Sequence, residues 1–114
     1  MGLDPTFQMK KYDTRPELAI TITDELTGNA LDLTGASAKF YLRPEKGGTI
    51  KIDGGTATIY GAAAGKVKYT WAGTADTNTP GRYLGEFEIT LAGGGIVTFP
   101  QNGYIQIHIL EGLG

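Results

Sequence analysis

The chain has 114 residues, with 10 basic and 12 acidic side chains and a net charge of −2. This length suits a single domain, and the balanced charge argues against nucleic acid as a partner, because phosphate binding needs a concentrated positive patch. The composition includes 18 glycines and no cysteine, which excludes disulfides and thiolate-bound metal and leaves stability to the core.

Apolar and polar side chains alternate along most of the chain, which is the periodicity of β-strands. Phe7 and Met9 indicate an edge strand near the start. We therefore treat residues 1–16 as an N-terminal arm or edge strand and residues 17–114 as the domain. The next expected strands cover residues 17–23, a short strand at Leu31 and Leu33, and residues 36–43, 49–52 and 56–60.

The second half of the chain continues the same alternation, with strands expected at residues 66–71, 82–91, 96–99 and 104–110. Their inward faces carry Val67, Tyr69, Trp71, Tyr83, Gly85, Phe87, Ile89, Leu91, Ile105, Ile107 and Ile109. Glycine clusters supply turns at Gly47-Gly48 and Gly54-Gly55 and a hairpin at 93–95. About eight short strands joined by turns predict an all-β sandwich, with a closed barrel as the alternative.

The segment before the strand at 82–91 resembles the corner that precedes strand F of immunoglobulin domains, through Asp76, Gly81 and Tyr83. In such a corner the tyrosine hydroxyl bonds to the upstream backbone. A Pro-Gly turn with a buried tyrosine is the alternative. The expected fold is therefore an immunoglobulin-like β-sandwich of about 7–9 short, mostly antiparallel strands.

Immunoglobulin strand order would place the strand at 36–43 beside the strand at 82–91. Basic side chains of the first strand would then face acidic side chains of the second, namely Lys39, Arg43, Glu86 and Glu88. Such exposed cross-strand pairs contribute only a few tenths of a kcal/mol each. We expect them to set register more than stability.

The side chains that could perform catalysis are few: Ser37 is the only serine and His108 the only histidine. Alternation places His108 on an outward face, which is typical of a solvated strand residue. Glu86 and Glu88 should stand roughly 6.5–7 Å apart on one face, a spacing seen in glycosidases, but that face is expected to be flat and wet. We therefore expect no enzyme and no catalytic, metal-binding or cofactor-binding residues.

A carbohydrate- or cell-surface-binding module is the alternative hypothesis, because β-sandwich modules often present aromatic platforms. Trp71 would make the best platform, but alternation sends it inward. Tyr41 and Tyr104 are expected to be exposed and are the candidate contacts for a sugar or for a protein partner.

Three stretches of the chain together resemble a known family. They are 17–24 with 31–36, then 62–71, and finally 81–87 with 98–104. The series is similar to the immunoglobulin-like N-terminal domain of tailed-phage baseplate upper proteins and to related short phage proteins. The resemblance implies a virion protein of tail, baseplate or capsid surface that docks onto other virion proteins and onto copies of itself. This chain lacks the helical and receptor-binding-protein-attaching parts of those baseplate proteins.

Residues 1–16 match no part of that family. Phe7, Met9 and Tyr12 are candidate anchors of an arm that lies along a neighbouring subunit. No stretch approaches the roughly 20 apolar residues of a membrane helix, and the first residues lack the apolar run of a secretion signal. We therefore expect a protein made in the bacterial cytoplasm and assembled into a virion, with neither a membrane nor nucleic acid as its partner.

Overall fold

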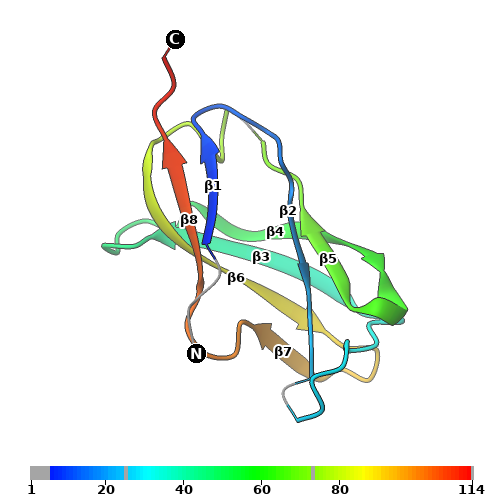
Figure 1. Cartoon of the computed structure of the whole chain (residues 1–114). Helices are drawn as coiled ribbons and strands as arrows, with labels where there is room; N and C mark the ends of the chain where they lie inside the picture. The colour runs from blue at the N-terminus through cyan, green and yellow to red at the C-terminus, as the bar shows by residue number, and fades with distance from the viewer. Residues whose placement is uncertain (1–5, 25, 73, 114) are drawn as a thin grey trace.

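The computed structural model describes residues 6–24, 26–72 and 74–113 (Figure 1). These residues form eight strands and one short 3-10 turn. The elements are β1 (Thr6–Lys10), β2 (Leu18–Thr21), β3 (Ser37–Pro44), β4 (Ile52–Gly61), η1 (Ala62–Ala64), β5 (Lys66–Tyr69), β6 (Gly81–Thr90), β7 (Ile96–Phe99) and β8 (Ile105–Leu110). The all-β, sandwich-like fold class predicted from the sequence is confirmed.

The strands follow the path β1-β8-β6-β3-β4-β5-β2, and β7 pairs with β6. β4 belongs to both layers, because its first half pairs with β3 and its second half pairs with β5. In Figure 1, β2 and β5 therefore stand across from β1 and β8. The two ends of the path, β1 and β2, do not pair with each other in the described residues, so the sheet folds over without closing into a barrel.

β3 and β6 form an antiparallel ladder that runs along all of β3. This is the neighbourhood that immunoglobulin strand order predicts. Lys39 stands opposite Glu88, whereas Arg43 stands opposite Leu84. No ion pair links the two strands within the described ranges. The facing charges therefore favour this alignment of the strands but contribute little to stability.

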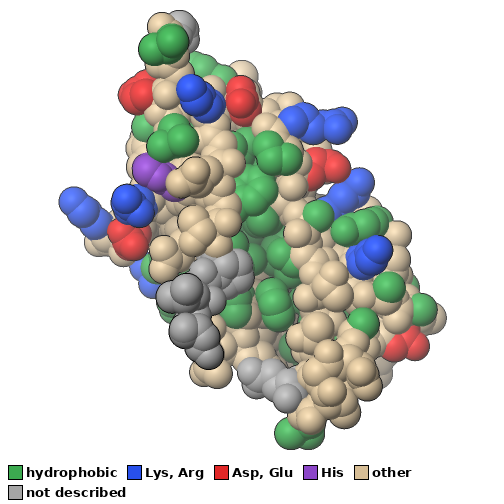
Figure 2. All heavy atoms as spheres, viewed as in Figure 1, with side chains coloured by type: hydrophobic (Ala, Val, Ile, Leu, Met, Phe, Trp, Pro, Cys, Tyr) green, Lys and Arg blue, Asp and Glu red, His purple; other side chains and the backbone are tan. Residues whose placement is uncertain are grey.

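The core lies between the two layers, where Figure 2 shows apolar side chains gathered between the β1–β8 side and the β2–β5 side. Every residue that alternation placed inward within β5, β6 and β8 is buried, as is Trp71 just after β5. Leu91, predicted inward at the end of the strand, follows β6 and is half-buried. Phe40 has no exposed surface, and its ring lies 4.8 Å from those of Tyr69 and Phe87. An aromatic cluster thus joins the two layers at the centre of the domain.

The prediction of a turn at Gly54-Gly55 is wrong, because both glycines lie inside β4. Register explains their role: Phe40 pairs with Gly55 and Tyr41 with Asp53, so Gly54 is the extra residue of a β-bulge. Gly54 has a φ of +77°, which favours glycine. The strand predicted at 56–60 therefore extends back through both glycines to Ile52 as one longer strand.

Two other strand predictions differ from the structure. Of the strand predicted at 49–52, only Ile52 belongs to a strand, as the first residue of β4. The segment with Leu31 and Leu33 contributes only an isolated bridge, Thr23 with Ala30. Leu33 is nevertheless buried in the core, as alternation predicted.

The corner before β6 has the predicted tyrosine hydrogen bond. The Tyr83 hydroxyl donates to the Thr79 carbonyl at 2.7 Å, and burial raises the pKa of Tyr83. Asp76 fixes the preceding loop, because its Oδ2 accepts from the Tyr69 hydroxyl and from the Ala72 N–H, both at 2.8 Å. Burial and this carboxylate together raise the pKa of Tyr69.

The start of the chain forms an edge strand, since β1 pairs in parallel with β8. After β1, the Tyr12 N–H donates to the Thr77 carbonyl at 3.0 Å, which holds this segment against the corner before β6. Residues 1–5 of the predicted arm lie outside the described residues. No helix in the described part of the chain is long and apolar enough to span a bilayer.

Candidate functional site

Tyr41 and Tyr104 come together on the outer face of the sheet, although 62 residues separate them in the sequence. They line one hollow of about 210 Å³. We call this the tyrosine hollow, and its lining residues are Tyr41, Arg43, Ile50, Leu84, Glu86 and Tyr104. The sequence predicted two exposed tyrosines, of which Tyr104 is exposed and Tyr41 is half-buried, and it did not predict that they share a site.

Strand register builds the tyrosine hollow. Tyr41 on β3 stands opposite Glu86 on β6, and Arg43 stands opposite Leu84. The Tyr41 ring lies over the Gly54 bulge, at a distance that would put a Cβ at Gly54 in ordinary contact, 3.5 Å from the Tyr41 hydroxyl oxygen. The Arg43 guanidinium lies 5.6 Å from the centre of the Tyr104 ring, within the range of cation–π attraction.

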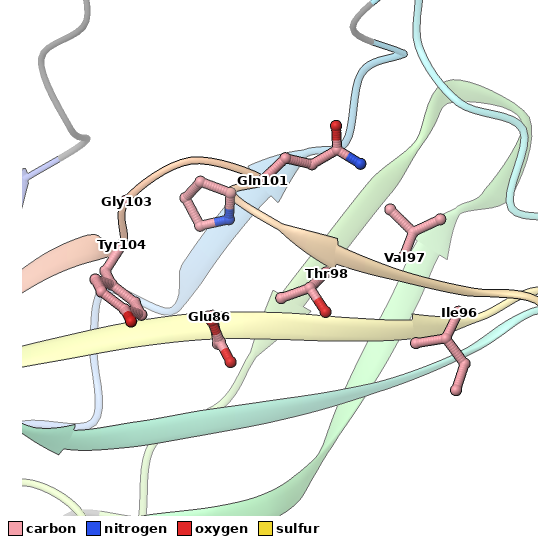
Figure 3. Close-up of a pocket in the computed structure, with 8 residues that line it drawn as sticks. Glu86, Ile96, Val97, Thr98, Gln101, Gly103 and Tyr104 are labelled. Atoms are coloured by element: carbon pink, nitrogen blue, oxygen red, sulfur yellow. The ribbon is translucent and has the colours of Figure 1, made fainter.

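A second hollow, of about 500 Å³, adjoins the first and shares Glu86 and Tyr104 with it. We call it the β7 hollow, because Ile96 and Thr98 of β7 also line it. Figure 3 shows Tyr104, Glu86, Thr98 and Ile96 projecting to the same side of the sheet, whereas Val97 projects to the other. The two hollows therefore form one continuous surface across β3, β6 and β7.

Glu86 is the acidic group at the centre of this surface. Its side chain is half-buried between the two hollows. The ion pairs recorded among the described residues lie elsewhere, at Lys11–Glu111 and Lys68–Glu17. The Glu86 carboxylate is thus placed to accept hydrogen bonds from a ligand or a partner.

The other predicted anchors lie away from the tyrosine hollow. Met9 has an exposed fraction of 4% and belongs to the core, so it is not an anchor for a neighbour. Phe7 is half-buried, with its ring 5.9 Å from that of Trp71. Tyr12 is exposed and lies beside Lys11, whose ammonium is 5.2 Å from the ring centre. Of these three, only Tyr12 offers most of its side chain to a partner.

His108 projects outward from β8, as alternation predicted, and is half-buried. It stands opposite Arg82 of β6 and Gln8 of β1. Together with Arg82 and Glu45 it lines two hollows at this end of the sheet. Arg82 is a permanent cation, so the surroundings of His108 are of mixed charge rather than an acidic cluster.

The acidic residues around the first long turn bind their own backbone. Asp24 Oδ1 accepts from the Leu26 N–H at 2.8 Å, and Asp32 Oδ1 accepts from the Thr34 N–H at 3.0 Å. The Thr34 bonds lower the pKa of Asp32. Within the described ranges, no group of three His, Cys, Asp or Glu residues is arranged to hold a metal ion.

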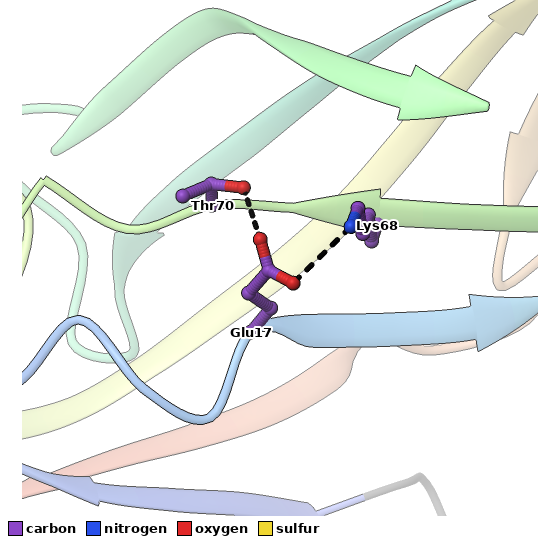
Figure 4. A network of polar contacts seen from close by, with 3 residues as sticks. All are labelled: Glu17, Lys68 and Thr70. Atoms are coloured by element: carbon purple, nitrogen blue, oxygen red, sulfur yellow. Dashed lines mark hydrogen bonds and ion pairs between the residues drawn. The ribbon is translucent and has the colours of Figure 1, made fainter. Parts of the chain in front are cut away.

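A separate polar cluster joins β2 to β5 on the other layer (Figure 4). Glu17 accepts from the Thr70 hydroxyl at 2.5 Å and from the Lys68 ammonium at 3.3 Å. The Thr70 bond, followed by the Lys68 bond, lowers the pKa of Glu17 below its ordinary value of 4.5. This cluster fastens the start of β2, which is an end strand of the sheet.

We predict that Glu17→Gln weakens the acid dependence of stability. Because the folded state lowers the pKa of Glu17, the ionised form favours folding; this contribution is complete above pH 4.5 and is lost as the pH falls through the folded-state pKa. Urea unfolding between about pH 6 and pH 3 should show a smaller loss of stability in the variant than in the wild type. In a Thr70→Val background the same substitution should matter less. Identical acid dependence in all these proteins would contradict the assignment.

Sequence reasoning missed Arg43, Ile50 and Leu84 as parts of the candidate site. Leu84 gave a signal, because an outward-facing leucine in the middle of a long strand breaks the expected polar face. Ile50 gave none, since its position depends on the loop between β3 and β4. No protein-family model and no curated protein matches this sequence.

Proposed function

We propose that the chain is a non-enzymatic structural protein of a tailed-phage virion, either a tail or baseplate component or a capsid decoration protein. It acts by docking onto other virion proteins and onto copies of itself. The observation that supports docking best is the tyrosine hollow, in which two tyrosines and an arginine gather on an exposed sheet face. Tyrosine and arginine are among the residue types that dominate binding energy at protein interfaces.

The surroundings of the tyrosine hollow suit a larger interface. A stable protein–protein contact buries about 800 Å² on each partner, which is more than this hollow alone provides. Ile50 and Ile96 extend the apolar surface on either side, with exposed fractions of 46% and 63%. Arg43 and Glu86 add charged groups that fix the orientation of a partner.

The test is to locate the chain in particles of the phage that encodes it and to measure its docking. Electron cryo-microscopy of purified particles should show the domain bound with Tyr41 and Tyr104 against a neighbour. The double variant Tyr41→Ala, Tyr104→Ala should bind particles depleted of this protein about tenfold or more weakly than the wild type. Tyr60→Ala is the control, because Tyr60 is an exposed tyrosine of β4 that does not line the tyrosine hollow. Particles without this protein would contradict the virion role, and unchanged binding by the double variant would contradict this surface.

Carbohydrate binding is the second candidate, and one observation favours it. Two tyrosine rings, a guanidinium and a carboxylate line a single hollow, which is the mixture of flat apolar faces and convergent polar groups that small-molecule sites use. A glycan array probed with the wild type and with Glu86→Gln separates the two candidates. Binding that depends on Glu86 and on both tyrosines would support sugar recognition, and its absence would leave protein docking.

A further inference from the structure

β7 is an edge strand with no charged residue. Its four residues, Ile96–Phe99, pair with β6 on one side, and the described residues form no strand on its other side. Exposed strand edges recruit other strands unless charges, prolines or bulges protect them. The edge strand β1, which pairs with β8, ends in Lys10 and is followed by Lys11, whereas β7 has neither a charge nor a proline among its four residues and is bounded by Pro100 at its C-terminal end.

The register of the hairpin shows which backbone groups of β7 face outward. The Leu91 N–H donates to the Gly95 carbonyl at 2.7 Å, so these two residues form a hydrogen-bonded pair. Antiparallel pairs alternate between hydrogen-bonded and non-hydrogen-bonded types. Ile96 and Thr98 therefore occupy non-hydrogen-bonded positions, and their N–H and C=O groups point away from β6.

Hollows flank β7 on both of its faces. The β7 hollow lies on the face of Ile96 and Thr98. The opposite face, that of Val97, borders another hollow of about 370 Å³, which we call the loop hollow. Leu26 and Leu31 also line the loop hollow, and Leu26 has an exposed fraction of 95%. A strand added to β7 would send its side chains alternately into these two hollows.

The charged side chains that line the two hollows are acidic. Glu86 lines the β7 hollow and Asp24 lines the loop hollow. Neither hollow is lined by a lysine or arginine from the described part of the chain. A partner strand is therefore favoured if it carries basic side chains.

We propose that the free edge of β7 binds an extended segment of a partner protein by strand addition. The backbone groups of Ile96 and Thr98 bond to the segment, a lysine or arginine side chain enters the β7 hollow beside Glu86, and an apolar side chain enters the loop hollow. This inference rests on the docking role proposed above and names the edge and the chemistry of the partner. Pairing of β7 with β7 of a second copy is disfavoured, because it would bring the acidic hollows of both copies together.

The test uses capped synthetic peptides of alternating valine and lysine, and of alternating valine and glutamate, with the full-length protein. The lysine peptide should bind about tenfold or more tightly than the glutamate peptide by fluorescence anisotropy. On addition of the lysine peptide, the amide protons of Ile96 and Thr98 should gain protection from hydrogen exchange. Glu86→Lys should reverse the preference between the two peptides.

Thr98→Pro is the decisive variant, because proline removes the outward N–H of Thr98 and leaves the ladder with β6 intact; proline is tolerated at such edge positions. It should abolish lysine-peptide binding with little change in the unfolding midpoint. Thr98→Val, which keeps the N–H, should bind like the wild type. Unchanged binding by Thr98→Pro, or equal binding of both peptides, would overturn the proposal.

Two further measurements separate the remaining outcomes. If sedimentation equilibrium shows that the wild type is a dimer and Thr98→Pro is a monomer, the β7 edge binds a second copy of the chain. That result would overturn the proposal of a basic partner segment. Particles that incorporate Thr98→Pro normally would overturn the inference about β7 while leaving the virion role standing. If the purified protein binds the lysine peptide through the β7 edge but the particles do not contain the protein, the inference about β7 stands and the virion role is contradicted.

Discussion

Phe40→Ala is expected to remove about 3–5 kcal/mol from the free energy of unfolding. The Phe40 ring has no exposed surface and is surrounded by the rings of Tyr69, Trp71 and Phe87. Truncation loses the transfer energy of the ring and leaves a cavity between the two layers, which the paired backbones of β3 and β6 cannot collapse to fill. Since domains of this kind are stable by only about 5–15 kcal/mol, the loss is a large share of the total.

Phe7→Ala is the matched control for this prediction. It removes the same ring from β1, where Phe7 is half-buried against Trp71, and should cost about 1–2 kcal/mol. Urea unfolding followed by tryptophan fluorescence measures both variants, because Trp71 is the only tryptophan. Equal losses at the two positions, or a loss below about 1.5 kcal/mol at Phe40, would show that the aromatic cluster does not join the layers as described.

Strand positions could be predicted because most strands have one buried and one solvated face. In β8, Ile105, Ile107 and Ile109 are buried while the residues between them reach the surface, and this pattern is visible directly in the sequence. The adjacency of β3 and β6 followed from strand order once the corner at Tyr83 indicated an immunoglobulin-like fold. At these places the alternation of side chains and the expected strand order led to the same structure, so the predictions from the sequence were correct.

Sequence reasoning failed where the same residues suit two structures. A glycine pair is compatible with a turn or with a bulge inside a strand, and only the partner strand decides between them. At Gly54 the partner is Tyr41 on β3, whose ring lies over the bulge. The error in the strand boundary and the failure to foresee the tyrosine hollow therefore have one cause, namely a cross-strand contact that no local pattern reports.

The central strand β6 links the interior to the proposed docking surface. Phe87 on its inner face is part of the aromatic cluster, and Glu86 beside it on the outer face lies between the two hollows. A strand held by such a core presents its outward residues at fixed spacing, which lowers the entropy lost when a partner binds. Substitutions in the core should therefore weaken docking through loss of stability, whereas substitutions of Glu86 should weaken it directly.

Gly65→Ala is the second prediction with a large expected effect. Gly65 follows η1 with a φ of +70°, a conformation that costs an alanine about 1–2 kcal/mol. A Cβ at this position would also lie 2.6 Å from the Ile22 carbonyl oxygen and 3.0 Å from that of Leu31. The Ile22 carbonyl oxygen cannot easily move, because it accepts from the Leu31 N–H at 2.9 Å. The Ile22 N–H in turn donates to the Gly65 carbonyl at 2.8 Å, which holds the two segments together.

Gly28→Ala separates the steric cost from the conformational cost. Gly28 has a similar φ of +77°, but a Cβ there would meet nothing within 4 Å, so its substitution should cost only about 1 kcal/mol. Gly65→Ala should lose about 2 kcal/mol more, because overpacking against fixed backbone adds to the same backbone strain. Thermal unfolding should show this as a midpoint lower by roughly 4 °C for each kcal/mol. If the two variants have the same unfolding midpoint, backbone conformation alone explains both losses of stability. The junction of Ile22, Leu31 and Gly65 would then be packed less tightly than its contacts imply.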